Sequence, residues 1–158
     1  QELADKLNGT FFYHDVTDED RWIEIINETE KKYGRIDVLV NNAGIVKPGD
    51  PENQTTEEYK FTMSVHMDST FFGCKYVIPV MAKNGGGSIV NMCSIASVQG
   101  ESYVAAYCAA KGAIEAYSRA VAVHCGLAKN GVRCNTIHPS GIATPMVASV
   151  HALMAEKF

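Results

Sequence analysis

The sequence has no Cys-x-x-Cys pair, no long apolar run and no excess of basic residues. A net charge of −4 argues against a nucleic-acid partner, because a phosphate backbone is bound by clustered Lys and Arg. The uncharged stretches are too short to cross a membrane. Without metal-ligand spacing we expect no metal site. We also expect the reduced thiols of a cytoplasmic protein for Cys74, Cys93, Cys108, Cys125 and Cys134.

What is present is the composition of a folded domain. The chain has 158 residues, of which 46% are hydrophobic and 20% charged, and this balance excludes a disordered chain. The length fits one domain or part of a larger one. The sequence does not begin with Met, and residues 1–7 resemble the interior of a helix. We therefore expect residues 1–158 to be a single, incomplete domain of a longer chain.

Strand-like and helix-like segments alternate along the sequence. The strand-like segments are residues 10–14, 36–40, 88–92 and 132–137. The helix-like segments are residues 17–34, 55–82 and 103–128, and a last one from residue 144. Start signals support two helices, namely Thr17 with Asp20 and Thr55 with Glu58. This order predicts a parallel sheet with helices on both faces, that is, an α/β fold of three layers.

Ligands of such sheets bind beyond the carboxyl ends of the strands. Four segments follow a predicted strand directly: Asp15-Val16, Asn41 to Gly44, Cys93-Ser94 and His138 to Thr144. We expect these segments to meet at one edge of the sheet and to form the functional site.

One pair of helix residues has the spacing of an acid/base pair. Tyr107 and Lys111 are four residues apart and therefore share a helix face. A nearby ammonium favours the phenolate and would lower the pKa of Tyr107 toward neutrality. Ser94, at the end of a strand, offers a hydroxyl that can hydrogen-bond a substrate oxygen. Each feature alone is also common in structural helices and turns, so their combination carries the argument.

These motifs, in this order, resemble the short-chain dehydrogenases/reductases. The matching segments are Asp15-Val16, Asn41-Asn42-Ala43-Gly44, Ser94, Tyr107-x-x-x-Lys111 and Pro139-Ser140-Gly141-Ile142-x-Thr144. The resemblance covers essentially the whole chain. It implies a Rossmann-type, doubly wound parallel sheet and NAD or NADP as cofactor, of which we favour NAD. It also implies hydride transfer between a secondary alcohol and a ketone.

The resemblance implies a role for each matched residue. Tyr107 would be the general acid/base, Lys111 would hold the nicotinamide ribose and lower the Tyr107 pKa, and Ser94 would polarise the substrate oxygen. Asp15 and the Val16 backbone would bind the adenine. The adenine-side ribose would be lined by Asn42, Ala43 and Gly44. The nicotinamide carboxamide would be flanked by Pro139, Gly141, Ile142 and Thr144.

Two residues depart from the pattern of the family. His66 stands where many members carry an Asn that is linked to the Lys through water. A relay through a neutral His66 would add a limb to the activity profile near pH 6 to 7, whereas a merely packed histidine would add none. Ser140 stands where the family usually has Gly. This variant is similar to hydroxysteroid and secondary-alcohol members, and it therefore favours a steroid or cyclic alcohol as substrate.

Other functions and the assembly stay open at this stage. A β-ketoacyl-carrier-protein reductase is the second candidate, and a non-catalytic dinucleotide sensor is the third. The resemblance implies a homodimer or homotetramer built by the helices from Thr55 and Tyr103. The apolar residues that would serve the sheet or the partner are Ala113, Ile114, Tyr117, Ala120, Val121 and Val123.

The Gly-rich phosphate-binding turn of the family, with its strand-helix-strand unit, has no counterpart in residues 1–158. Because backbone N–H groups of that turn cradle the pyrophosphate, we expect this chain alone to bind NAD(H) weakly. Calorimetry of the isolated chain with NAD(H) measures this, and micromolar affinity would contradict the expectation.

Overall fold

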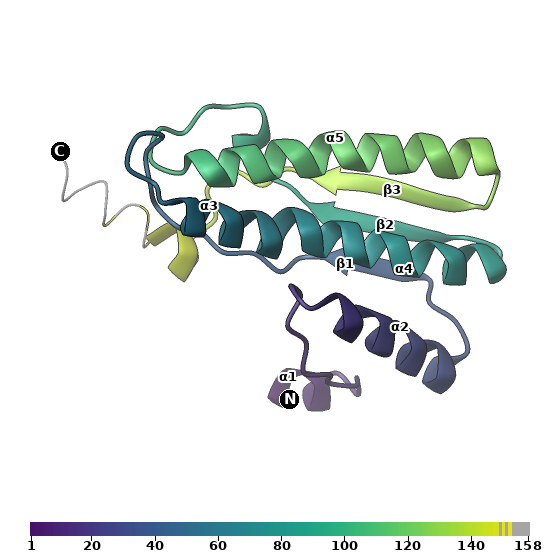
Figure 1. The fold of residues 1–158 in the computed structure, drawn as a ribbon. Coiled ribbons are helices and arrows are strands. Elements are labelled where there is room, and N and C mark those ends of the chain that lie inside the picture. The colour runs from purple at the N-terminus through teal and green to yellow at the C-terminus, as the bar shows by residue number, and fades with distance from the viewer. Residues whose placement is uncertain (149, 151, 153–158) are drawn as a thin grey trace.

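The computed structural model describes residues 1–148, 150 and 152 (Figure 1). The elements, in chain order, are α1 (Glu2–Lys6), α2 (Glu19–Tyr33), β1 (Val38–Asn41), α3 (Thr56–Met63), η1 (Ser64–Asp68), α4 (Ser69–Lys83), β2 (Gly87–Met92), η2 (Ile95–Ser97), α5 (Ala105–Ala128) and β3 (Val132–Ile137). Here η1 is a π-helical turn and η2 a 3₁₀ turn. Residues 145–148 are helical, which agrees with the predicted last helix. None of the described helices is apolar enough over a sufficient length to cross a bilayer.

The three strands form a parallel sheet in the order β1-β2-β3. Asn41 of β1 pairs with Asn91 of β2, which pairs with Thr136 of β3. The alternation of strands and helices therefore gives the predicted parallel α/β fold. All three strands end at the same edge, so the segments that follow them meet there.

The predicted strand at residues 10–14 is absent, and this expectation was wrong. The segment pairs with no strand of the described sheet, and Phe11 and Tyr13 are exposed. Side-chain contacts with α2 hold it instead: Arg21 Nε donates to the Tyr13 carbonyl at 2.9 Å, and the His14 ring packs edge-on against Trp22. An aromatic segment becomes a strand only where a neighbouring strand supplies hydrogen-bond partners.

The sequence predicted Thr17 as the N-cap of α2, and the structure places the N-cap one residue later. Asp18 caps this helix by accepting from the Arg21 amide, whereas Thr17 donates to the Asp15 carboxylate. The signal before α3 is confirmed, because Thr55 and Glu58 form a reciprocal capping box.

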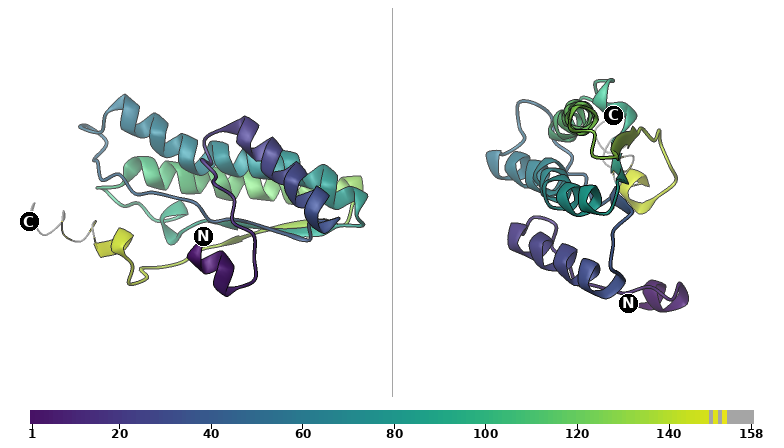
Figure 2. Two further views of the ribbon diagram at one scale, coloured as in Figure 1. Left: turned by 90° about the horizontal axis from the view of Figure 1, so that it is seen from below. Right: turned by 90° about the vertical axis from the view of Figure 1, so that its right-hand side faces the viewer.

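Helices α4 and α5 cover one face of the sheet (Figures 1 and 2), and α2 packs against α4. Leu39, Ile89 and Cys134, which are register partners, point toward the helices. On the opposite face the β1 residues Val38 and Val40 are 58% and 51% exposed. The described residues thus supply the sheet and one helical layer of the predicted three-layer arrangement.

The long predicted helix at residues 55–82 is continuous but contains the π-helical turn η1. A π-turn frees carbonyl groups from the regular hydrogen-bond ladder. Two hydroxyls accompany it: Ser69 Oγ donates to the Val65 carbonyl at 2.6 Å, and Thr70 Oγ1 donates to the His66 carbonyl at 2.8 Å. The predicted bend near Pro79 does not end the helix, which continues to Lys83.

A buried polar chain crosses the interface between sheet and helices. Asn41 Nδ2 donates to Asn91 Oδ1 at 2.8 Å, and Asn91 Nδ2 donates to Ser118 Oγ of α5 at 2.8 Å. Asn91 is completely buried. Since an unpaired buried polar group costs about 1–3 kcal/mol, this chain fixes how β1, β2 and α5 sit against each other.

We expect Asn91→Ala to lower the free energy of unfolding by about 2–4 kcal/mol, because it leaves a cavity and removes the hydrogen-bond partner of the buried Asn41 Nδ2 and the donor to Ser118 Oγ. Urea unfolding measures the loss. Asn135→Ala is the matched control, since Asn135 lies exposed on β3, and it should change stability by less than about 0.5 kcal/mol. Equal losses in the two variants would contradict this role of Asn91.

Candidate active site

The segments that follow the three strands, together with α5, enclose a cavity of about 500 Å³. It lies at the carboxyl edge of the sheet, where the sequence predicted the site. The predicted residues that line it are Asn42, Ala43, Gly44, His66, Ser94, Tyr107, Lys111, Pro139, Ile142 and Thr144. Additional lining residues are Met92, Cys93, Ser140, Pro145, Met146 and Val147.

Three predicted residues lie outside this cavity. Gly141 lines an adjoining cavity of about 220 Å³, together with Ser94 and Tyr107. Asp15 is exposed and accepts two hydrogen bonds from Thr17, and the Val16 carbonyl accepts from Trp22 Nε1 at 2.9 Å. The structure therefore brings the predicted catalytic group together and leaves the predicted adenine contacts apart from it.

Ser94, Tyr107 and Lys111 converge in the cavity. Tyr107 is hydrogen-bonded to Ser94, and the Lys111 ammonium lies 5.4 Å from the centroid of the Tyr107 ring. Ser94 also accepts from the Ala96 amide at 3.1 Å, which fixes it at the start of η2. A hydroxyl, a phenol and an ammonium thus face one space, which is the arrangement needed to polarise an oxygen and move its proton.

Two contacts that the sequence did not reveal fix Lys111. Its Nζ donates to the Met92 carbonyl at 2.6 Å, and its own carbonyl accepts from Cys93 Sγ at 3.1 Å. The residue is only 4% exposed. Since a backbone carbonyl has no sequence signature, no pattern in the sequence could have predicted these two contacts.

Burial, rather than the charge of a neighbouring residue, is the main cause of the pKa shifts of Tyr107 and Lys111. It lowers the pKa of Lys111 to about 8. Burial also raises the pKa of Tyr107, against a smaller opposing effect of the Ser94 hydrogen bond. The expectation that Lys111 would bring the pKa of Tyr107 down is therefore wrong for this structure. Desolvation disfavours the phenolate, and the main opposing effect comes from the Ser94 hydrogen bond rather than from Lys111.

His66 is held in η1 directly behind Tyr107. Its ring stands edge-on to the Tyr107 ring, with 5.3 Å between centroids, and its Nε2 lies 2.7 Å from the Ile45 carbonyl. The Ile45 amide also lies 3.2 Å from this Nε2, so Nε2 meets both a donor and an acceptor, and the shorter contact to the carbonyl favours the tautomer with the proton on Nε2. The buried Nδ1 has no hydrogen-bond partner within the described part of the chain. Gly44 is needed here, because a Cβ at that position would lie 2.7 Å from His66 Cε1.

The expected activity limb of His66 near pH 6 to 7 is not supported by its surroundings. Burial, reinforced by the charge of Lys111, lowers the pKa of His66 to about 4. The imidazole is therefore neutral throughout the neutral range, and any relay through it operates without a change of charge.

We expect His66 to make stability depend on pH between 6.5 and 4. In this window the unfolded chain binds the proton and the folded chain does not, so stability falls as the pH falls, by up to about 3 kcal/mol. His66→Asn should flatten this dependence, as measured by urea unfolding at several pH values. The exposed control His124→Asn should keep the wild-type slope, and a wild-type slope in His66→Asn would contradict the expectation.

A family model described as enoyl-(acyl carrier protein) reductase matches residues 1–157. A crystal structure from Burkholderia xenovorans, described as a short-chain dehydrogenase/reductase, superimposes with a TM-score of 0.87 at 32% identity and covers 99% of this chain. The chain belongs to the short-chain dehydrogenase/reductase family. It covers 62% of that Burkholderia chain.

Curated members of the short-chain dehydrogenase/reductase family are similar over most of this chain. An NADP-dependent (R)-specific alcohol dehydrogenase of Lentilactobacillus kefiri is 40% identical over 93% of the chain. A 3-beta-hydroxysteroid dehydrogenase of Comamonas testosteroni is also 40% identical over 93%. The chain spans 60% and 58% of these two relatives.

Proposed function

We propose that the protein containing this chain is an NAD(P)-dependent oxidoreductase that interconverts a secondary alcohol and a ketone. The observation that carries the proposal is the convergence of Ser94, Tyr107 and Lys111 in one cavity at the carboxyl edge of the sheet. The relative named as an (R)-specific alcohol dehydrogenase supports an alcohol as substrate, and the one named as a 3-beta-hydroxysteroid dehydrogenase supports a hydroxysteroid. Another relative, named as a cyclopentanol dehydrogenase, supports a cyclic alcohol.

The cavity fits the nicotinamide end of the cofactor. Small residues after β1 allow close approach of a flat ring, and the segment after β3 forms the opposite wall. The residues that would flank the nicotinamide carboxamide are Pro139, Gly141, Ile142 and Thr144, and Lys111 would bind the nicotinamide ribose. Asn42, Ala43 and Gly44 would line the adenine-side ribose. Asp15 and Val16 would serve the adenine. When bound, the cofactor supplies the hydride chemistry. We favour NAD, although one relative is named as NADP-dependent.

The side chains would divide the remaining work. The Ser94 hydroxyl orients the substrate oxygen and stabilises its partial charge. Tyr107 exchanges the proton with that oxygen, and its raised pKa keeps the phenol protonated at neutral pH, ready to donate in ketone reduction. Lys111 lies behind Tyr107 and, with a pKa of about 8, loses its proton in mildly alkaline solution.

His66 would replace the Asn of other family members as the acceptor behind Lys111. With the proton on Nε2, Nδ1 can accept a hydrogen bond from a water molecule that is also bound by Lys111. Its low pKa keeps this acceptor neutral. This assignment retains His66 in the catalytic group together with Ser94, Tyr107 and Lys111.

Reduction of a β-ketoacyl group on a carrier protein is the second candidate. The matching family model, described as an enoyl-(acyl carrier protein) reductase, supports a carrier-bound acyl substrate but names a different reduction. A β-ketoacyl thioester and a cyclic secondary alcohol, offered to the same enzyme, distinguish the two. A homodimer or homotetramer through α4 and α5 also stays a proposal. Its support is that Phe71 and Val123 are 39% and 62% exposed on these helices, whereas Ile114 and Val121 are buried against the sheet.

We expect Tyr107→Phe to lower kcat more than a hundredfold and to leave the KM for cofactor nearly unchanged, because it removes one proton donor and little packing. The measurement is the absorbance of reduced nicotinamide with cyclohexanol or a 3-hydroxysteroid. Tyr117→Phe on the same helix is the control and should keep kcat. If Tyr107→Phe keeps more than about a tenth of kcat, a loss below about 1.4 kcal/mol, Tyr107 is not the acid/base.

A further inference from the structure

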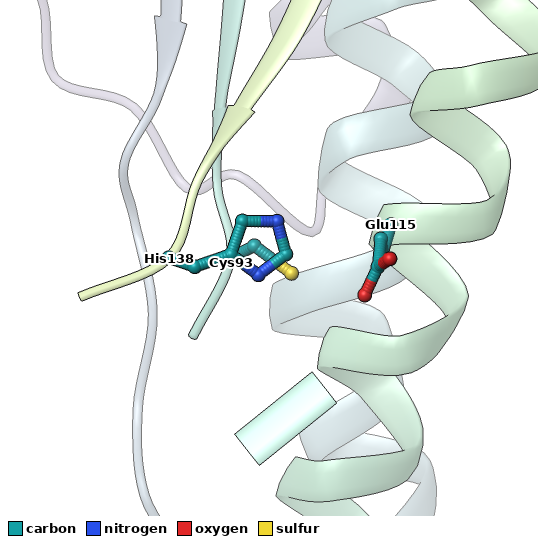
Figure 3. Close-up of side chains that lie close together, drawn as sticks. All are labelled: Cys93, Glu115 and His138. Atoms are coloured by element: carbon teal, nitrogen blue, oxygen red, sulfur yellow. The ribbon is translucent and has the colours of Figure 1, made fainter. Parts of the chain in front are cut away.

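Beside the cavity, three side chains of metal-binding type meet between the sheet and α5. Cys93 follows β2, His138 follows β3, and Glu115 lies on α5. One potential ligand atom from each residue lies within 4.8 Å of the other two. Figure 3 shows the imidazole beside the thiol, with the carboxylate facing them from the helix. Cys93 is buried, Glu115 is half-buried and His138 is exposed, so the cluster is open to solvent on one side.

We propose that Cys93, Glu115 and His138 form a binding site for Zn²⁺. Thiolate, imidazole and carboxylate are the three ligand types that zinc accepts in proteins, and three protein ligands with one open position form a common arrangement. One thiolate and one carboxylate balance the two charges of the cation, so a partly buried site would carry no net charge. The thiolate also favours zinc over Mg²⁺ or Ca²⁺, which prefer oxygen ligands.

The site needs only small movements of side chains. In a tetrahedral zinc site neighbouring ligand atoms are about 3.5 Å apart, so separations of up to 4.8 Å need to shrink by no more than about 1.3 Å. The backbone positions of the three residues are already fixed, because two of them follow strands and the third lies on the long helix α5. Coordination therefore asks for side-chain rotation rather than for a change of the fold.

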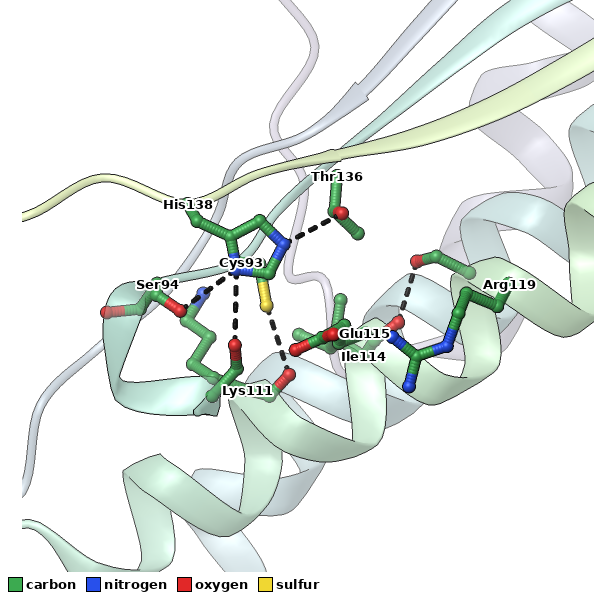
Figure 4. Close-up of polar contacts among 10 residues, drawn as sticks. Cys93, Ser94, Lys111, Ile114, Glu115, Arg119, Thr136 and His138 are labelled. Atoms are coloured by element: carbon green, nitrogen blue, oxygen red, sulfur yellow. Dashed lines mark hydrogen bonds and ion pairs between the residues drawn. The ribbon is translucent and has the colours of Figure 1, made fainter. Parts of the chain in front are cut away.

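The existing contacts of the cluster are ones that a metal ion can displace (Figure 4). Cys93 Sγ donates a weak hydrogen bond to the Lys111 carbonyl at 3.1 Å. His138 Nδ1 lies 3.1 Å from both Ser97 Oγ and the Ser94 carbonyl, and Nε2 lies 2.9 Å from Thr136 Oγ1. On zinc binding the thiol releases its proton to solvent, and one imidazole nitrogen gives up its contact.

Glu115 is already ionised and oriented for this role. Ser97 and Arg119 hydrogen-bond its carboxylate and hold its pKa below the usual range. The ion pair with Arg119 uses Oε1, and a carboxylate has a second oxygen with which it can bind a cation. Arg119 itself is 68% exposed, so it can move into solvent when the cation approaches.

The absence of a sequence motif does not count against this site. The sequence predicted no metal because the cysteines lack Cys-x-x-Cys spacing, which is typical of sites built on a single loop or hairpin. Here the ligands come from three elements that only the parallel sheet and α5 bring together. The proposal does not depend on the dehydrogenase activity, because it rests on the three side chains alone.

The test is a titration of the chain with ZnCl₂ in competition with a chromophoric chelator. We expect one Zn²⁺ per chain, and at least tenfold weaker binding in Cys93→Ser, in His138→Asn and in Glu115→Gln. Cys108→Ser and His124→Asn are the controls, since these residues lie away from the cluster, and they should bind as the wild type does. Circular dichroism and thermal unfolding establish that each variant is folded.

A second measurement needs no variant. X-ray absorption at the zinc edge of the wild-type chain with one equivalent of Zn²⁺ should show one sulfur ligand and otherwise nitrogen and oxygen ligands. A zinc environment without sulfur would overturn the proposal, as would a wild-type affinity equal to that of folded Cys93→Ser. Failure of this site would leave the proposed alcohol oxidation untouched, because that activity is tested by Tyr107→Phe.

Discussion

The ammonium of Lys111 donates to the Met92 carbonyl, and the Lys111 carbonyl in turn accepts from the Cys93 thiol. These two contacts tie α5 to the carboxyl end of β2 from both directions. Ser94 is the next residue along the chain, and Tyr107 lies one helical turn before Lys111. The Ser94 hydroxyl and the Tyr107 phenol therefore meet because Lys111 holds this part of α5 against the backbone at the end of β2.

Removal of water is the dominant electrostatic effect around this anchor. Burial disfavours the charged form of Tyr107, Lys111 and His66 alike, although these residues are of opposite charge types. At neutral pH Tyr107 and His66 are therefore uncharged, and Lys111, whose pKa is about 8, is the charged member of the three.

Local sequence signals predicted most elements and the central part of the site. The apolar strands, the capping box at Thr55 and the Tyr107/Lys111 spacing each report on a few neighbouring residues, and these were confirmed in position. The segment at residues 10–14 was mistaken for a strand because pairing depends on distant strands. The cluster of Cys93, Glu115 and His138, and the shifted pKa of His66, depend on packing between distant segments, which no local pattern encodes.

The π-helical turn η1 has a consequence for comparing this chain with its relatives. Such a turn holds one residue more than the α-helical turn it replaces. An alignment with a relative whose helix is regular throughout must therefore open a one-residue gap within residues 64–68. If the gap is placed on the wrong side of His66, the position behind Tyr107 is assigned to Val65 or Met67.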